Sequence, residues 1–151
     1  MKALVIYDSV YGNTEKIAQA VGDALNNGVR VVHVGEAVPT ELGTLDLLII
    51  GSPTQGGRPT KPMQDFLSRI PESSLKNVKV TSFDTRISTR LVGIFGYAAG
   101  RILEALKTRK GQIAAFPQGF FVRGTRGPLK EGELERAVSW AQGILEIEKK
   151  D

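Results

Sequence analysis

Apolar residues occur along the chain in short runs, and segments of helical period separate these runs. Four runs rich in β-branched and other apolar residues predict buried strands, at 2–7, 29–34, 46–51 and 78–83. We expect a last strand within 112–122, interrupted near Pro117 and Gly119.

Between the runs, apolar residues recur every three or four positions, which predicts helices. The first helix follows a cap at Asn13 or Thr14, and a shorter helix covers 62–70 with Pro62 near its first turn. A third helix ends near Gly111, and a fourth occupies the C-terminal part. The apolar faces expected for the first, third and fourth helices are Ile17, Val21, Ala24 and Leu25, then Phe95, Ala99, Ile102 and Leu106, and finally Leu134, Val138, Ala141 and Leu145.

Strands that alternate with helices favour an α/β fold, a doubly wound five-stranded parallel sheet between two layers of helices. No repeat or long linker divides the sequence, so residues 1–151 are expected to form a single domain. In such a sheet the ligand crevice lies outside the carboxyl ends of the strands. The loops that begin after Tyr7, Gly51 and Phe83 are therefore where we expect the site.

Composition limits the class of protein. The chain has 151 residues, 41% of them hydrophobic and 24% charged, which is ordinary globular usage. It has no cysteine, which excludes disulfide frameworks, thiolate metal sites, iron–sulfur clusters and a cysteine nucleophile. No apolar run is long enough to span a bilayer, and the first residues lack the pattern of a signal peptide. A soluble cytoplasmic domain is the expectation.

Charge is distributed unevenly. The net charge is +4, yet residues 76–130 carry eleven basic and two acidic side chains, whereas residues 1–50 carry three basic and six acidic ones. This asymmetry can steer an anionic partner or substrate, although a solvated basic face without a partner gives the same pattern. No helix-turn-helix, zinc-finger spacing or basic run with aromatic residues favours nucleic acid.

The loop after the first strand carries candidate chemistry. It joins the hydroxyl residues Ser9 and Thr14 and a glycine, Gly12, directly to a helix N-terminus. Backbone N–H groups and the helix dipole make such a loop suitable for a phosphate. It contains no Lys or Arg, so neutral donors would hold the dianion, and it matches neither a Walker A loop nor the dinucleotide fingerprint. An ordinary capped turn is the alternative.

A second loop makes the pattern specific. Ser9-Val10-Tyr11-Gly12-Asn13-Thr14 resembles the phosphate-binding loop of flavodoxins, and Gly51-Ser52-Pro53-Thr54-Gln55-Gly56-Gly57 resembles their flavin-contacting loop, in the form typical of the quinone-reductase-like branch. The resemblance covers the whole chain. No segment resembles the insertion that marks long-chain members, so the chain resembles the short-chain type. The family's fold has strand order 2-1-3-4-5.

The resemblance implies FMN as the cofactor. It assigns Ser9, Val10, Tyr11, Gly12, Asn13 and Thr14 to the phosphate, and Pro53, Thr54, Gln55, Gly56 and Gly57 to the isoalloxazine and ribityl chain. It also makes Gly56 and Gly57 candidates for redox tuning, because a backbone carbonyl near such a glycine can reorient in this family.

The loop after the fourth strand departs from the family. By its position, the backbone of Asp84 and Thr85 is expected at the pyrimidine edge of the flavin. The usual stacking aromatics are missing, since none lies within 54–61 or 85–93, and Trp140 on the last helix is expected to pack. Arg86 either replaces one of these aromatics and places positive charge near the flavin, or it caps the sheet or pairs with Asp84.

Other chemistries find little support. His33 is the only histidine and is expected to be structural, and no nucleophile elbow or metal-ligand spacing occurs. Receiver domains share this topology, but they need an acidic residue where Gly51 and Ser52 stand.

Three functions remain open at this point. The first is an FMN-binding electron carrier that acts with a redox partner protein. The second is an FMN-dependent oxidoreductase for a quinone, a porphyrinogen or a similar small acceptor, and the third is a module of this fold with little FMN affinity. Enzymatic activity and oligomeric state are not predicted. An acidic docking surface on the partner would face the basic candidates Arg58, Lys61, Arg86, Arg90, Arg123 and Arg126.

Overall fold

A parallel sheet forms the centre of the molecule. The computed structural model describes residues 1–26, 28–87 and 96–150. The strand order is β2-β1-β3-β4-β5, and β6 also pairs with β4. The strands are β1 (Ala3–Tyr7), β2 (Arg30–His33), β3 (Leu47–Pro53), β4 (Lys79–Ile87), β5 (Gln112–Ile113) and β6 (Gln118–Val122). The doubly wound sheet expected from the sequence is confirmed.

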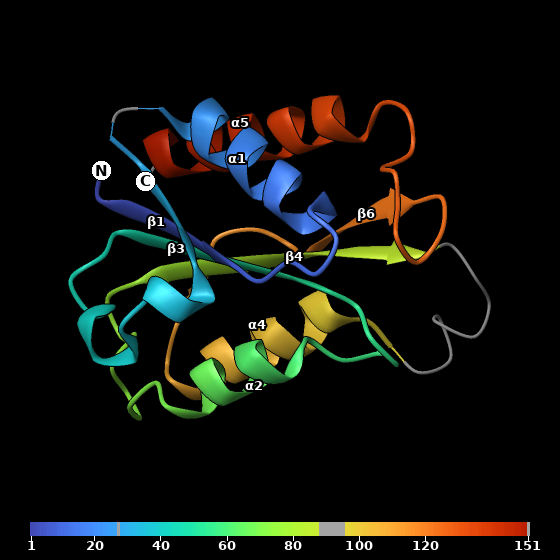
Figure 1. The fold of residues 1–151 in the computed structure, drawn as a ribbon. Coiled ribbons are helices and arrows are strands. Elements are labelled where there is room, and N and C mark those ends of the chain that lie inside the picture. Colours follow the sequence, from blue (N-terminus) through green and yellow to red (C-terminus); the bar gives the residue numbers. More distant parts are fainter. Residues whose placement is uncertain (27, 88–95, 151) are drawn as a thin grey trace.

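Helices cover both faces of the sheet, as Figure 1 shows, with α1 and α5 on one side and α2 and α4 on the other. Within β3, Leu47 and Ile49 belong to the core under α1 and α5, whereas Leu48 and Ile50 belong to the core under α2 and α4. Because successive side chains of a strand point to opposite faces, one apolar run serves both cores. The helices are α1 (Asn13–Leu25), η1 (Val34–Glu36), η2 (Pro39–Glu41), α2 (Lys61–Ser68), α4 (Ala98–Thr108) and α5 (Glu133–Lys150).

The last strand is split into two pieces along the same edge of β4. Pro117 lies in the gap between β5 and β6, as expected, but Gly119 does not interrupt the strand. It lies inside β6 opposite Asp84, where a Cβ atom would stand 2.2 Å from Cζ of Arg86. Glycine is needed there to make room for a side chain, and this expectation was therefore wrong.

Two helix predictions need correction. The residue that precedes α1 is Gly12, with a φ of 92°, and Asn13 and Thr14 already belong to the helix instead of capping it. On α5, Leu134 is 42% exposed, and the buried face consists of Ala137, Ala141 and Ile144. Small alanines let α5 approach α1 closely. Phe95, expected on the third helix, lies outside the described residues.

Candidate functional site

A cavity of about 380 Å³ lies at the carboxyl ends of β1, β3 and β4. This is where a doubly wound sheet places its ligand crevice, and the volume is within the range of small-molecule sites. Its lining residues are Ser9, Val10, Tyr11, Asn13, Thr14, Pro53, Thr54, Gln55, Gly56, Thr85, Arg86, Ile87, Val122 and Thr125.

The structure brings most of the predicted site residues together around this cavity. Three of the predicted residues, Gly12, Gly57 and Asp84, are absent from the lining of the cavity. For every predicted site residue, contact with a flavin stays a prediction. The sequence reasoning missed Ile87, Val122 and Thr125. Ile87 and Val122 end β4 and β6 at the same edge of the sheet, and that shared edge was the available signal.

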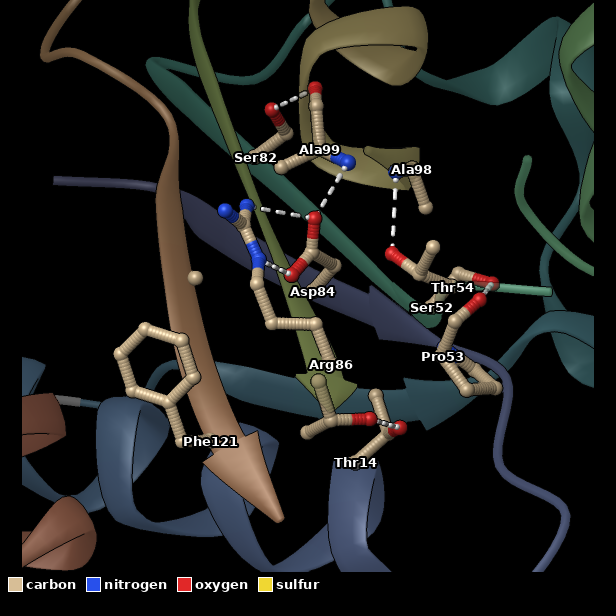
Figure 2. A network of polar contacts seen from close by, with 12 residues as sticks. Thr14, Ser52, Pro53, Thr54, Ser82, Asp84, Arg86, Ala98, Ala99 and Phe121 are labelled. Carbon is tan, nitrogen blue, oxygen red and sulfur yellow. Dashed lines mark hydrogen bonds and ion pairs between the residues drawn. The ribbon is translucent and has the colours of Figure 1, made fainter. Parts of the chain in front are cut away.

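The loop before α1 presents hydrogen-bond donors. The Gly12 N–H donates to the Ser9 hydroxyl oxygen at 3.0 Å, and the first backbone bond into the helix runs from the Lys16 N–H to the Gly12 carbonyl. No side chain of the described residues caps α1, so its first N–H groups are available to an anion. The Thr14 hydroxyl lies 2.8 Å from the Thr85 hydroxyl and joins α1 to β4 (Figure 2).

Asp8 anchors the start of the same loop. One carboxylate oxygen accepts the Ser9 N–H at 2.8 Å and lies 3.1 Å from Nε2 of His33, while the other accepts the Thr60 hydroxyl. The Gly35 N–H donates to Nδ1 of His33 at 3.0 Å, so Nε2 carries the proton and donates to Asp8. His33 is therefore structural, as the sequence analysis expected.

Tyr7 ends β1 just before this loop, and its hydroxyl donates to Glu15 on α1 at 2.9 Å. Burial, and then the hydrogen bond and charge of Glu15, raise the pKa of the Tyr7 phenol. The phenol stays protonated and joins β1 to α1 below the site.

The loop after β3 turns back on itself. Backbone hydrogen bonds of 2.8 and 3.0 Å connect Gln55 and Arg58, and Gly56 and Gly57 between them have φ values of 56° and 79°. Glycine adopts this left-handed region without strain, whereas other residues rarely do. The turn places Gly56 in the cavity wall.

Helix α4 holds this loop against the sheet. The Arg101 Nε donates to the Gly57 carbonyl at 2.8 Å, and the Ala98 N–H donates to the Thr54 hydroxyl at 3.0 Å. The Thr54 N–H in turn donates to the Thr85 carbonyl at 2.9 Å. The loop after β3 is therefore held both by α4 and by the end of β4, and Figure 2 shows part of these contacts.

Two residues of β4, Asp84 and Arg86, form an ion pair beside the cavity, and Figure 2 shows its hydrogen bonds. Nε and Nη2 of Arg86 donate to the two carboxylate oxygens of Asp84 at 2.7 and 2.8 Å, and the Ala99 N–H donates to Asp84 at 2.9 Å. Asp84 is fully buried, and Cζ of Arg86 lies 3.4 Å from the centre of the Tyr97 ring. Of the alternatives for Arg86, pairing with Asp84 is the one observed, and the side chain also lines the cavity.

Trp140 packs against the core, as expected. Its ring meets Phe83 and Phe120 edge to face, each at 6.1 Å between ring centres. Among the residues that line the cavity, Tyr11 is the aromatic one, and it is half exposed.

Comparison with known proteins identifies the family. The model of the flavodoxin family matches residues 5–140. The chain belongs to the flavodoxin family. A flavodoxin of Maridesulfovibrio salexigens is 26% identical to this flavodoxin over 96% of the chain and 97% of the relative.

Solved structures agree with the fold. Flavodoxin 2 of Bacillus cereus superimposes with a TM-score of 0.82 at 24% identity, covering 97% of this chain and 99% of that one. The rubredoxin oxygen:oxidoreductase of Desulfovibrio gigas superimposes with a TM-score of 0.75 at 19% identity, over 99% of this chain but 36% of that larger chain. Within residues 1–26, 28–87 and 96–150, no helix is both long and apolar enough to cross a membrane.

The cofactor of the family fits the residues present. Flavodoxins bind FMN and transfer electrons, and this is the function of the chain. The donor set agrees, because an uncapped helix N-terminus suits a phosphate, and the cavity beside it is lined by neutral polar and apolar groups together with Arg86, which is paired with Asp84. When bound, FMN supplies one- and two-electron transfer, and the protein sets its electrostatics and hydrogen bonds.

Proposed function

We propose that this flavodoxin holds FMN in the cavity at the carboxyl edge and passes electrons to a protein partner with an acidic docking surface. The observation that carries the proposal is the convergence of the uncapped α1 N-terminus with the loop after β3 and the carboxyl end of β4 around one cavity. We further propose that the chain works as a single domain in the cytoplasm.

In this proposal the residues of the first loop bind the phosphate. Ser9 and Thr14 contribute hydroxyl groups, and the first N–H groups of α1 add neutral donors. The loop from Pro53 to Gly57 and the end of β4 flank the ring. Arg86 supplies donors that the Asp84 carboxylate holds in a fixed orientation.

Exposed arginines beside the cavity support an acidic partner. Arg58 follows β3, and Arg123 follows β6. Both are exposed, and neither forms an ion pair within the described part of the chain. Two other candidates are less suitable, since Lys61 pairs with Asp65 at 3.0 Å and Arg86 pairs with Asp84. Of the remaining two candidates, Arg126 is exposed, and Arg90 lies outside the described residues.

The first test is the visible absorption spectrum of the purified protein after FMN is added and the excess removed. The proposal requires the paired flavin bands at about one FMN per chain. Absence of retained flavin, together with unquenched FMN fluorescence on titration, would contradict it. Rapid turnover of NAD(P)H with a quinone, without any partner protein, would instead favour the oxidoreductase alternative.

The second test concerns docking. The rate of electron transfer from the reduced protein to an acidic iron–sulfur protein should fall as salt is added. Arg58→Glu should slow this rate several-fold at low ionic strength, because a charge at the rim changes association more than stability. Lys76→Glu is the matched control, since Lys76 is exposed just before β4, at the opposite edge of the sheet.

Equal effects of the two substitutions would contradict docking at the cavity. A faster reaction with a basic haem protein than with the acidic one would contradict the charge of the proposed partner.

A further inference from the structure

A short segment between β6 and α5 lies against the loop before α1. This segment, residues 123–128, is called the strap below. The Arg123 N–H donates to the Pro128 carbonyl and the Gly127 N–H to the Gly124 carbonyl, each at 2.9 Å. These bonds close the strap into a compact turn whose ends are fixed by β6 and by the bridge between Val122 and Leu129.

The strap packs directly on the first residue of α1. Nδ2 of Asn13 donates to the Arg126 carbonyl at 3.3 Å, across 113 positions of sequence. A Cβ atom on Gly127 would stand 2.6 Å from the same Nδ2, so the backbone of the strap approaches Asn13 as closely as glycine permits. One of the two side-chain N–H groups of Asn13 thereby donates to the strap, and its backbone N–H is available to an anion.

This contact brings a cation to a loop that has none of its own. Residues 8–14 contain no Lys or Arg. Cζ of Arg126 lies 5.9 Å from the centre of the Tyr11 ring. Tyr11 lines the cavity, and so does Thr125, which precedes Arg126 in the strap. The arginine that lines the cavity, Arg86, is already neutralised by Asp84.

The position of Arg126 beside the N-terminus of α1 is electrostatically unusual. Helix N-termini carry partial positive charge, so an arginine beside α1 is disfavoured unless an anion lies there too. Arg126 is exposed and has no carboxylate partner among the residues that the structure describes, and its guanidinium is therefore available to a phosphate.

We propose that Arg126 binds the terminal phosphate of FMN and makes the site selective for the phosphorylated flavin over riboflavin. The proposal rests on the proposed function and adds a cationic residue to a phosphate loop of neutral donors. Arg126 is a binding residue brought to the loop from the far end of the chain, and the strap is the element that positions it.

The experiment compares the affinities of FMN and riboflavin, which share the ring and the ribityl chain and differ in the phosphate. Arg126→Gln should weaken FMN binding by about tenfold, the loss of one charge-assisted hydrogen bond, and leave riboflavin binding unchanged. Fluorescence quenching gives both dissociation constants, at low and at physiological salt. The FMN affinity of the variant should also depend less on salt than that of the wild type.

Lys16→Gln is the matched control. Lys16 is exposed in the first turns of α1, so the substitution removes one positive charge near the same helix end without touching the strap. It should leave both affinities unchanged. Thermal unfolding of the variants without flavin should show that each retains its fold.

Three outcomes would overturn the inference. FMN affinity that survives Arg126→Gln, an equal loss of riboflavin affinity, or an equal effect of Lys16→Gln would each exclude specific phosphate recognition by Arg126. In all three cases the wild type still binds FMN, so the proposed function stands. A wild type that binds neither flavin would overturn the proposed function and this inference together.

Discussion

Two hydroxyl groups, those of Ser9 and Thr14, lie in the loop that we propose binds the phosphate. Ser9 accepts a hydrogen bond from the Gly12 N–H, which leaves its own proton free to donate. Thr14 is buried and shares its hydroxyl with Thr85, so its role combines loop geometry with any contact to the cofactor.

We expect Ser9→Ala and Thr14→Ala each to weaken FMN binding by ~1.5–3 kcal/mol, the value of a hydrogen bond to a charged acceptor. Titration of FMN fluorescence measures this loss. Ser139→Ala on the exposed face of α5 is the matched control and should have no effect. Unchanged affinity in both variants would mean that the phosphate loop is assigned wrongly.

The charge of Glu133 contributes to the stability of the folded chain. Its carboxylate accepts the Phe121 N–H at 2.7 Å and hydrogen bonds from Arg136 at 2.7 and 2.8 Å. The Arg136 hydrogen bonds, together with the Phe121 N–H, lower the pKa of Glu133 below its ordinary value, against the effect of burial. The folded protein therefore favours the ionised form.

The resulting stability is present above the unfolded pKa of about 4.3 and is lost as the pH falls through the lower pKa of the folded state. Glu133→Gln should therefore lower the free energy of unfolding at pH 7, and its difference from the wild type should shrink toward pH 3. Urea unfolding at several pH values measures both. A difference that does not change with pH would contradict the ionic role of Glu133.

At the scale of elements, close approach of neighbouring strands decides where glycine stands. Gly119 in β6 faces Arg86, whose guanidinium fills the space that a Cβ atom would take. The Asp84–Arg86 pair at the end of β4 therefore depends on the adjacent strand. A Cβ atom on Gly51 in β3 would likewise stand 2.1 Å from the Phe83 ring.

Gly119→Ala should destabilise the protein by about 1–3 kcal/mol or more, because it displaces Arg86 from a buried carboxylate. The same substitution at Gly143 on α5, where a Cβ atom meets nothing within 4 Å, should stabilise the protein by about 0.5–1 kcal/mol. Chemical denaturation measures the free energy of unfolding of both variants. Similar changes in stability at the two positions would contradict the packing argument.

The elements also show where periodicity misleads. On α5 the predicted apolar face ran from Leu134 through Ala141. The structure buries Ala141, but together with Ala137 and Ile144, and it leaves Leu134 exposed. Apolar spacing identifies a helix, but which of two overlapping faces is buried depends on how closely the neighbouring helix approaches.

At the scale of the whole molecule, cofactor binding and folding are linked. FMN that binds the folded chain alone should stabilise it by about 2.7 kcal/mol when its free concentration is 100-fold above the dissociation constant. Thermal unfolding should then shift upward by roughly 5–10 °C for a protein of this size. Riboflavin at the same free concentration should shift it less, since it lacks the phosphate. Equal shifts would contradict a phosphate site in the folded protein.

Local patterns in the sequence are enough to predict the order of strands and helices along the chain, a site at the carboxyl edge, and the two loops whose residues resemble those of flavodoxins. Local periodicity and turn chemistry encode these features, because each depends on residues a few positions apart. Three features are visible only in the folded chain. Arg86 pairs with Asp84 against the Tyr97 ring, Gly119 makes room for the Arg86 side chain, and the strap lies on Asn13. The contacts of Gly119 and of the strap join segments that are distant in the chain. Whether such segments meet depends on the order of strands in the sheet and on how closely they pack, and no local pattern records either.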